Sequence, residues 1–513
     1  MQEATPDDQA SDHSDEDFFV KKHDNSTAIT QLDEYLTSSS TETMTSQHGH
    51  LSSSSSSKQT LPCQLALHAS SWAYLHPNEG SEVEQGLCSV NSQWQQTMRT
   101  SPKAVQNEPV SLGVTLTKGA VRDNLPPVAR ALALHEFKMA SHVKTRTMNR
   151  RVTLDAVNVL RTSEVPIPEP PPEGAIVKVM FAGVCHTDVR TVGRLYHAKF
   201  VFPRVLGHEI SGTIYRLGDE VVKARPDVKI GDRVSVYPWG KCQQCANCLS
   251  DIPLCTTLHY GRGPMDSYVY GVWRDGGYQN YVVVDFIQFL INIPNNVGMD
   301  AAATLMCGGV TSYNAVTSLG ESIGRARKAS GNALVALIGA GGLALWALQI
   351  IKALYPTGVR VLAVDINDEK LQDAKAAGAD LTHRWDTSES AEVAADCMIK
   401  SCGARPDAII ELTGLTGVIK RALLSLNIGG TITLVGLGEV WMPEMTIDSV
   451  IRRNIQIKGV VVGSKRQCVE LIDLVQQGKV RPPPMTHIRL EDLDEALDKL
   501  DKGTQRGRAV VKM

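Results

Sequence analysis

The sequence predicts an α/β protein with a disordered N-terminal segment, a β-rich domain and a doubly wound parallel domain. Three observations lead to this prediction. Serine fills 20 of the first 126 positions. Short strand patterns and glycine-rich turns then continue to about residue 290. From residue 332 onward strand and helix patterns alternate, which is typical of a parallel sheet covered by helices on both faces.

The N-terminal segment, 1–126, has no sustained helical or strand period and contains the run Ser52–Ser57. Such a composition buries too little apolar surface to offset chain entropy, so we expect disorder. The first residues are acidic, and they lack both the apolar stretch of a secretory signal and the arginine-rich character of a mitochondrial transit peptide. We therefore expect a cytoplasmic protein.

Charge and hydropathy exclude several classes of partner. The 513 residues carry 52 Lys and Arg against 55 Asp and Glu, a net charge of −3. This balance argues against a nucleic-acid-binding protein and against a polybasic membrane-surface protein. The most apolar stretch, Ala333–Ile351, is long enough to cross a bilayer. Its three glycines divide it into a strand, a turn and a helix, so we expect no membrane span.

The β-rich part begins at about residue 127. Val128–Phe137 is predicted as a first strand and Ala175–Ala182 as the next. Residues 138–160 are polar and basic, and we expect a loop or insertion there. The proline-rich stretch 165–172 is predicted to be a rigid connector, because proline fixes φ and donates no hydrogen bond.

The second part is predicted from strands that alternate with helices. The predicted strands are Ala333–Ile338, Val359–Val364, Ala408–Leu412 and Thr431–Val435. The last fifty residues return to helix and strand patterns and end in a strand at Arg508–Val511.

A glycine motif follows the first of these strands. Gly339, Gly341 and Ala344 fit G-x-G-x-x-A, a variant of the Rossmann dinucleotide-binding fingerprint. Gly339 permits the tight turn, Gly341 lets the backbone approach a pyrophosphate, and the helix that begins near Gly342 offers free N–H groups. Asp365 ends the next strand, where an acid accepts hydrogen bonds from the ribose hydroxyls and repels a 2′-phosphate.

This motif favours NAD over NADP as the cofactor. Lys370 lies one turn after Asp365 and is a further candidate for the ribose. The alternative interpretation of Asp365 is a helix N-cap.

Four cysteines lie within fourteen residues, at Cys242, Cys245, Cys248 and Cys255. Four thiolates without an open position match a structural zinc site. A redox pair and a nucleic-acid zinc finger are the alternatives. The finger is disfavoured because Lys241 is the one basic residue within the cluster.

A second set of metal-binding residue types is dispersed along the chain. Cys185 follows a strand, His208 lies in G-H-E, and Cys307 lies in M-C-G-G. Two thiolates and one imidazole leave a fourth position for water or substrate, which is typical of catalytic zinc. Taken singly, the cysteines are equally compatible with small buried residues and the histidine with a hydrogen-bonded core residue.

Together these motifs resemble the zinc-containing medium-chain dehydrogenase/reductase family, and within it the alcohol dehydrogenases. The matching segments are G-V-C-H-T-D at 183–188, L-G-H-E at 206–209, the cysteine lobe at 242–255, D-G-G-Y at 275–278, G-A-G-G-L-A at 339–344 and G-R-A-V-V at 507–511. The resemblance implies a GroES-like catalytic domain at 127–307, an inserted Rossmann domain at 308–462 and a return to the catalytic domain at 463–513.

The resemblance also implies the role of each residue. Cys185, His208 and Cys307 hold a catalytic zinc, and the four-cysteine lobe holds a second zinc. Thr187 takes the proton from the alcohol, Asp188 lies near the zinc ligands, and Glu209 lies behind the metal. Cofactor contacts are implied for His186, Gly339, Gly341, Gly342, Asp365, Lys370 and Arg508. The implied activity is reversible, NAD-dependent oxidation of an alcohol to an aldehyde or ketone by a homo-oligomer, a dimer or tetramer.

Three features depart from the family pattern. Six residues separate Cys248 from Cys255, where the family usually has seven. Arg190 stands where several relatives have a relay histidine, and neither the N-terminal segment 1–126 nor the segment 138–160 has a counterpart in the family. Trp239, Tyr278 and Met306 are candidates for the pocket wall or for the core. The alternative function is a scaffold or regulator that acts through its N-terminal tail.

Overall fold

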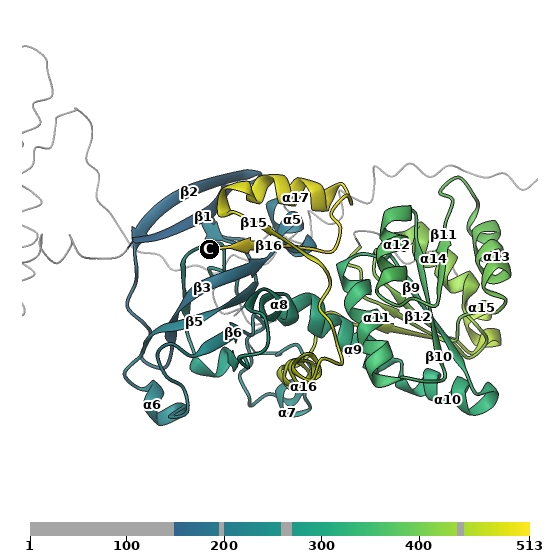
Figure 1. Cartoon of the computed structure of the whole chain (residues 1–513), viewed down its shortest axis with the longest axis horizontal. Coiled ribbons are helices and arrows are strands. Elements are labelled where there is room, and N and C mark those ends of the chain that lie inside the picture. The colour runs from purple at the N-terminus through teal and green to yellow at the C-terminus, as the bar shows by residue number, and fades with distance from the viewer. Residues whose placement is uncertain (1–147, 194–199, 258–268, 439–445) are drawn as a thin grey trace, which may run out of the picture. The chain divides into compact units, whose positions relative to one another are not determined.

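The computed structural model describes residues 148–193, 200–257, 269–438 and 446–513. All of them belong to one compact unit of the chain, Lys118–Met513 (Figure 1). The predicted disordered segment 1–126 and the predicted strand Val128–Phe137 lie outside the described residues.

A mixed, mostly antiparallel sheet carries the first half of the described chain. It has seven strands in the order β15-β16-β3-β5-β6-β8, with β7 also paired to β3. Of the last two strands in sequence, β16 pairs with β3 and β15 pairs with β16, so the end of the chain joins the sheet that the first half forms. The strands are β3 (Ala175–Gly183), β5 (Glu209–Leu217), β6 (Arg233–Val236), β7 (Tyr281–Val284), β8 (Leu290–Asn292), β15 (Met485–Ile488) and β16 (Arg508–Lys512).

The predicted loop at 138–160 is wrong over its described part. Residues 148–166 form an antiparallel hairpin of β1 (Met148–Ala156) and β2 (Val159–Pro166), and β1 also pairs with β4 (Arg204–Val205). Val152 and Leu154 are buried, whereas the basic residues that suggested a loop lie at more exposed positions. A strand with one solvated face tolerates such residues, and this hid the strand pattern.

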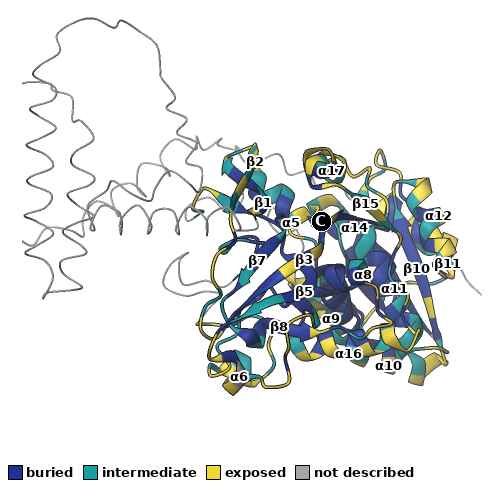
Figure 2. Ribbon diagram, turned by 60° about the vertical axis from the view of Figure 1, so that its left-hand side comes forward, coloured by how far each residue is buried: buried dark blue, intermediate teal, exposed yellow. Residues whose placement is uncertain are grey.

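A six-stranded parallel sheet carries the second half. Its order is β11-β10-β9-β12-β13-β14, the 3-2-1-4-5-6 arrangement of the Rossmann fold. The predicted strands are confirmed to within one residue at each end, and β9 and β12 are buried along their whole length. Figure 2 shows the neighbouring strand β10 mostly in the dark blue of buried residues. The strands are β9 (Ala333–Ile338), β10 (Val359–Asp365), β11 (Leu381–Arg384), β12 (Ala408–Glu411), β13 (Thr431–Leu434) and β14 (Gln456–Gly459).

Helices flank this parallel sheet and connect the two halves (Figure 1). The sheet is accompanied by α10 (Gly320–Ser330), α11 (Gly342–Leu354), α12 (Asp368–Ala376), α13 (Ala391–Cys402), α14 (Thr416–Ser425) and α15 (Ile447–Arg453). The remaining helices are α5 (His186–Val192), α6 (Val221–Ala224), α7 (Ala246–Leu249), α8 (Met299–Thr304), α9 (Val310–Ser318), α16 (Lys465–Gln476) and α17 (Leu493–Asp501). Short turns lie at Ile287–Phe289 and Leu490–Asp492, and a π-helical turn lies at Leu305–Gly309.

The apolar stretch Ala333–Ile351 divides as predicted into β9, a glycine turn and the start of α11. In the part of the chain that the structure describes, no helix has the length and apolarity needed to span a bilayer. One continuous apolar core joins the two sheets, since Trp239 and Met306 belong to the same buried cluster as Val335 and Trp346.

Candidate active site

Four side chains of metal-binding type converge between β3, β5 and the π-helical turn. Cys185 is the N-cap of α5, just after β3, and His208 and Glu209 stand at the start of β5. Cys307 lies in the π-helical turn. All four are buried, and their ligand atoms lie within 4.8 Å of one another. The antiparallel pairing of Gly183 with Glu209 creates this meeting of distant segments.

The donor set fits zinc. Four ligands at about 2.3 Å from a tetrahedral zinc ion lie about 3.8 Å apart, and the Sγ atoms of Cys185 and Cys307 are 4.0 Å apart. The Cys307 thiol holds the pKa of Cys185 well below its usual range, which favours the thiolate. Neither ring nitrogen of His208, which is completely buried, has a hydrogen-bond partner among the described residues. A metal ion satisfies such an orphaned imidazole.

Asp188 organises the loops around these ligands. Its Oδ2 accepts hydrogen bonds from the backbone N–H of Cys185 at 3.0 Å and from the hydroxyl of Tyr278 at 3.0 Å. Its Oδ1 accepts from the N–H of Gly207 at 3.1 Å and lies 3.8 Å from Nδ1 of His208. The carboxylate therefore faces one ring nitrogen of His208 and leaves Nε2 for a metal.

Tyr278, a candidate pocket residue, belongs to this buried network. Its hydroxyl also contacts the carbonyl of Gly183 at 3.2 Å, and the side chain is fully buried. Met306 is likewise fully buried in the core. Trp239 is buried with its ring 5.8 Å from that of His208, so it borders the metal-binding cluster.

Glu209 lies against the cluster and pairs with Arg508. The Arg508 guanidinium donates a hydrogen bond to Oε1 of Glu209, and both side chains are buried. Burial raises the pKa of Glu209 to about 7, although Arg508 opposes the shift. An ideal Cβ on Gly183 would lie 2.0 Å from Oε2 of Glu209, so the glycine makes room for this carboxylate.

The other residues at the start of α5 lie nearer to solvent. The Oγ1 atom of Thr187 is 3.9 Å from Sγ of Cys185, and its side chain is half-buried. His186 is exposed, and Arg190 is half-buried on the same helix. The hydroxyl of Thr187 thus adjoins the ligand cluster, whereas His186 makes no hydrogen bond or ion pair with the glycine turn among the described residues.

The four-cysteine lobe is assembled around α7. The Sγ atoms of Cys242 and Cys248 are 3.9 Å apart, and those of Cys245 and Cys255 are 3.8 Å apart. All four lie within 4.8 Å of one another. These separations match the tetrahedral edge of a zinc site, and the shortened spacing before Cys255 does not displace it from the set.

The dinucleotide motif forms a tight turn between β9 and α11. Gly339 has φ 92°, a left-handed conformation that favours glycine, and Gly341 is the N-cap of α11. Arg508 packs on this turn, because an ideal Cβ on Gly342 would lie 2.5 Å from its Cδ. Arg508 therefore touches both the metal-binding cluster and the glycine turn.

Asp365 lies at the end of β10 and contacts the same turn. Its Oδ2 accepts a hydrogen bond from the N–H of Ala340 at 2.7 Å, and Oδ1 accepts from the N–H groups of Ile366 and Asn367. The N-cap of α12 is Asn367, not Asp365, so the N-cap alternative is wrong. Lys370 is half-buried in the first turn of that helix.

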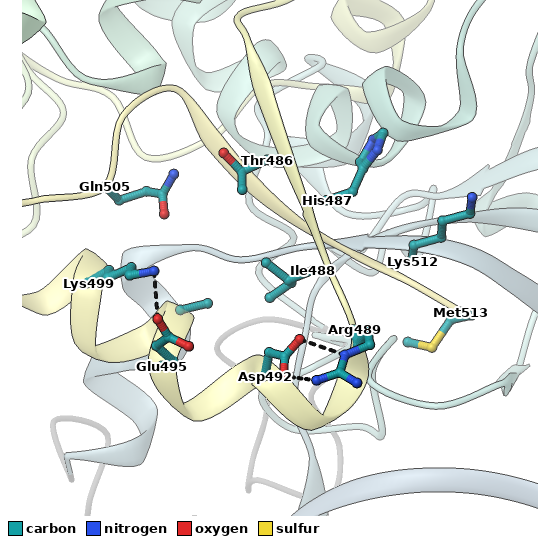
Figure 3. Close-up of a pocket in the computed structure, with 11 residues that line it drawn as sticks. Thr486, His487, Ile488, Arg489, Asp492, Glu495, Lys499, Gln505, Lys512 and Met513 are labelled. Atoms are coloured by element: carbon teal, nitrogen blue, oxygen red, sulfur yellow. Dashed lines mark hydrogen bonds and ion pairs between the residues drawn. The ribbon is translucent and has the colours of Figure 1, made fainter.

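A separate cavity of about 420 Å³ lies over β15, β16 and α17. Figure 3 shows it beside two ion pairs, Arg489 with Asp492 and Lys499 with Glu495. It contains none of the converging metal-binding residues, so we assign it no part in the chemistry.

Comparisons with known proteins agree with this geometry. Residues 171–295 match the model of the alcohol dehydrogenase GroES-like domain, and 342–477 match that of the zinc-binding dehydrogenases. The chain is 31% identical over 369 residues to an alcohol dehydrogenase of Geobacillus stearothermophilus, covering 71% of this chain and 99% of that protein. It is also 31% identical to an NAD-dependent alcohol dehydrogenase of Sulfurisphaera tokodaii, over 69% of this chain and 96% of that one.

Solved structures give the same result. The alcohol dehydrogenase of Aeropyrum pernix aligns with a TM-score of 0.61 at 27% identity, over 71% of this chain and all of that one. An acetophenone reductase of Geotrichum candidum, solved with NAD, aligns with a TM-score of 0.59 at 26% identity, over 71% of this chain and 97% of that one.

Proposed function

The chain belongs to the zinc-containing, alcohol dehydrogenase-like branch of the medium-chain dehydrogenase/reductase family, and on this premise we propose that it is an NAD-dependent alcohol dehydrogenase. Its substrate is a small alcohol, which it oxidises reversibly to an aldehyde or ketone. The observation that carries the proposal is the convergence of Cys185, His208 and Cys307 beside a threonine hydroxyl. No feature of the described residues favours the scaffold alternative.

In this proposal Cys185, His208 and Cys307 hold the catalytic zinc, and the four-cysteine lobe holds a second, structural zinc. When bound, zinc polarises the substrate hydroxyl and NAD accepts the hydride. Asp188 keeps His208 in the orientation and tautomer that a metal ligand needs. Glu209 with Arg508 forms a buried charge pair behind the ligand set.

Thr187 performs the proton transfer in this proposal. Its hydroxyl accepts the proton that the alcohol loses and donates its own proton outward. Arg190 stands on the next turn of α5, where several relatives have an imidazole, so this helix offers no neutral base there. With NAD bound, the proton would leave through the cofactor ribose and water.

The glycine turn receives the pyrophosphate, because free N–H groups at the start of α11 attract anions. Arg508 adds a positive charge at that place, with His186 as a further pyrophosphate contact. Asp365 and Lys370 bind the adenosine ribose, and the carboxylate of Asp365 selects NAD over NADP. We divide the chain into a catalytic domain at 127–307, a cofactor domain at 308–462 and a catalytic return at 463–513.

The decisive experiment measures zinc content and NADH formation over a panel of primary and secondary alcohols. We expect two zinc ions per chain and turnover of at least one alcohol. Cys185→Ser removes a thiolate ligand, so it should abolish turnover and release one zinc. Cys397→Ser on α13 is the matched control, since that thiol lies outside both metal-binding sets. Two bound zinc ions without turnover on any alcohol would overturn the substrate assignment.

We also propose a homo-oligomer in the cytoplasm. The edge strand β14 pairs on one side with β13, and exposed isoleucines stand near it at Ile447, Ile451 and Ile457. An exposed apolar sheet edge favours pairing with a second copy. Ile451→Glu should therefore shift the mass measured by light scattering towards the monomer, whereas an unchanged mass would contradict this interface. The three described cysteines outside both metal-binding sets, Cys397, Cys402 and Cys468, are free thiols, which suits a reducing compartment.

A further inference from the structure

The loop that leads into β16 contacts the parallel-sheet domain at two separate points. One point is the glycine turn, which Arg508 touches. The other is α12, the helix that follows Asp365, and the residue that reaches it is Arg506. The roles assigned above use Arg508 and Asp365, but they leave Arg506 without a function.

All three guanidinium nitrogens of Arg506 face carboxylates of α12. Nε donates to Oδ2 of Asp373 at 2.9 Å, and a terminal nitrogen donates to Oδ1 of the same carboxylate. The other terminal nitrogen lies 3.7 Å from Oε2 of Glu369. Glu369 and Asp373 are four residues apart, so they share one face of the helix. Arg506 is 51% exposed and Asp373 22%, so the contact lies at the surface, but its two-pronged hydrogen bonding defines the geometry better than a single ion pair would.

The segment from Arg506 to Arg508 is itself tightly placed. Gly507 has φ 58°, and an ideal Cβ there would lie 2.1 Å from the carbonyl oxygen of Pro484. The N–H of Arg508 donates to the same carbonyl at 2.9 Å. A shift of Arg506 therefore passes directly to Arg508, whose side chain lies on the glycine turn and on Glu209.

We propose that Arg506 is a positioning residue that clasps α12 to the strand carrying Arg508, and that it thereby sets the affinity for NAD. The inference rests on the proposed function. The clasp fixes the position of Arg508, at the pyrophosphate end of the cofactor site, relative to α12, the helix that follows Asp365 at the ribose end. Its main effect is expected on cofactor binding, because Arg506 itself makes no described hydrogen bond or ion pair with the ligand cluster and reaches it only through Arg508.

The test measures the Kd of NADH by fluorescence titration on the full-length, zinc-loaded chain, without turnover. Arg506→Gln should raise Kd about fivefold, which corresponds to about 1 kcal/mol, while kcat at saturating NAD stays near the wild-type value. Arg506→Lys keeps the charge but loses the two-pronged geometry, so it should fall in between. Lys502→Gln is the matched control, because Lys502 pairs with Asp498 and makes no contact with α12.

A charge exchange tests the contact itself. Arg506→Glu and Asp373→Arg should each weaken NADH binding, and the double variant should bind more tightly than Arg506→Glu alone. A folded Arg506→Gln protein with the wild-type Kd, or a double variant no better than Arg506→Glu, would overturn the clasp while the proposed function stands. Failure of the wild-type chain to bind NADH would overturn both. If Arg506→Glu does not fold, Arg506→Gln and Arg506→Lys still decide the matter.

Discussion

Replacement of Asp188 by asparagine should weaken the proposed catalytic zinc site although Asp188 is not itself a ligand. The carboxylate is 1% exposed and accepts three hydrogen bonds, from Cys185, Gly207 and Tyr278. Asparagine offers one oxygen and one NH₂ group. In either orientation, the NH₂ group faces a buried N–H, which leaves a donor unsatisfied at a cost of about 1–3 kcal/mol.

The same change removes the charge that faces His208 at 3.8 Å. Loss of the group that orients a metal-bound histidine lowers metal affinity by about 10- to 100-fold. The assay is a competition titration with a coloured chelator, in which the four-cysteine lobe retains its zinc as an internal reference. We expect one of two zinc ions to become easy to remove.

Tyr278→Phe is the matched control for Asp188→Asn. It removes one of the three donors but keeps the negative charge beside His208. We expect a stability loss of about 1 kcal/mol and a zinc affinity within about threefold of the wild type. If a folded Asp188→Asn protein binds zinc within about twofold of the wild type, the orienting role of Asp188 is refuted.

Three further predictions concern separate parts of the molecule. Cys255→Ser leaves three thiolates in the lobe, so metal analysis should find one zinc instead of two, and calorimetry should find a lower Tm. Two retained zinc ions would contradict the four-cysteine site. Asp365→Asn should raise the KM for NAD at least about tenfold and improve the relative use of NADP, and steady-state kinetics with both cofactors will show whether it does. Burial raises the pKa of Glu411 at the end of β12, so the folded state binds more protons there than the unfolded state. Stability relative to Glu411→Gln should therefore fall as pH rises above about 4.3, the ordinary pKa of glutamate, and Tm values that change in parallel with pH in the two proteins would disprove it.

The sequence predicted best where the signal is local. The turn between β9 and α11 needs glycine at a left-handed position, and a fully buried parallel strand is a continuous apolar run, so both stand out in the sequence. The cysteine lobe is likewise contained in one short segment. In these features the residues that carry the chemistry are already close together in the sequence, and the structure adds the distances between them.

Sequence patterns missed partners that are distant in the chain wherever the family resemblance did not supply them. The hairpin at 148–166 is marked by two buried apolar residues, Val152 and Leu154, among basic ones, and its pairing with β4 lies beyond any local pattern. Tyr278 and Asp188 are separated by ninety positions, and the D-G-G-Y motif gave no sign that the tyrosine hydroxyl binds that carboxylate. The ion pair between Arg506 and α12 is of the same kind, because it depends on how two sheets are packed.

The pairing register of β3 around Gly183 explains why the metal-binding cluster and the glycine turn lie at one site. Gly183 pairs with Glu209 of β5 on one side and with Val510 of β16 on the other. Directly opposed residues of paired strands point to the same face of a sheet, and so do residues two positions apart in one strand. Val510 therefore shares a face with Glu209, and so does Arg508, which lies two residues before Val510. Because glycine has no side chain, nothing separates the carboxylate from the guanidinium that crosses above it. The glycine at 183 is therefore required by the charge pair, and the same guanidinium then extends that face to the glycine turn.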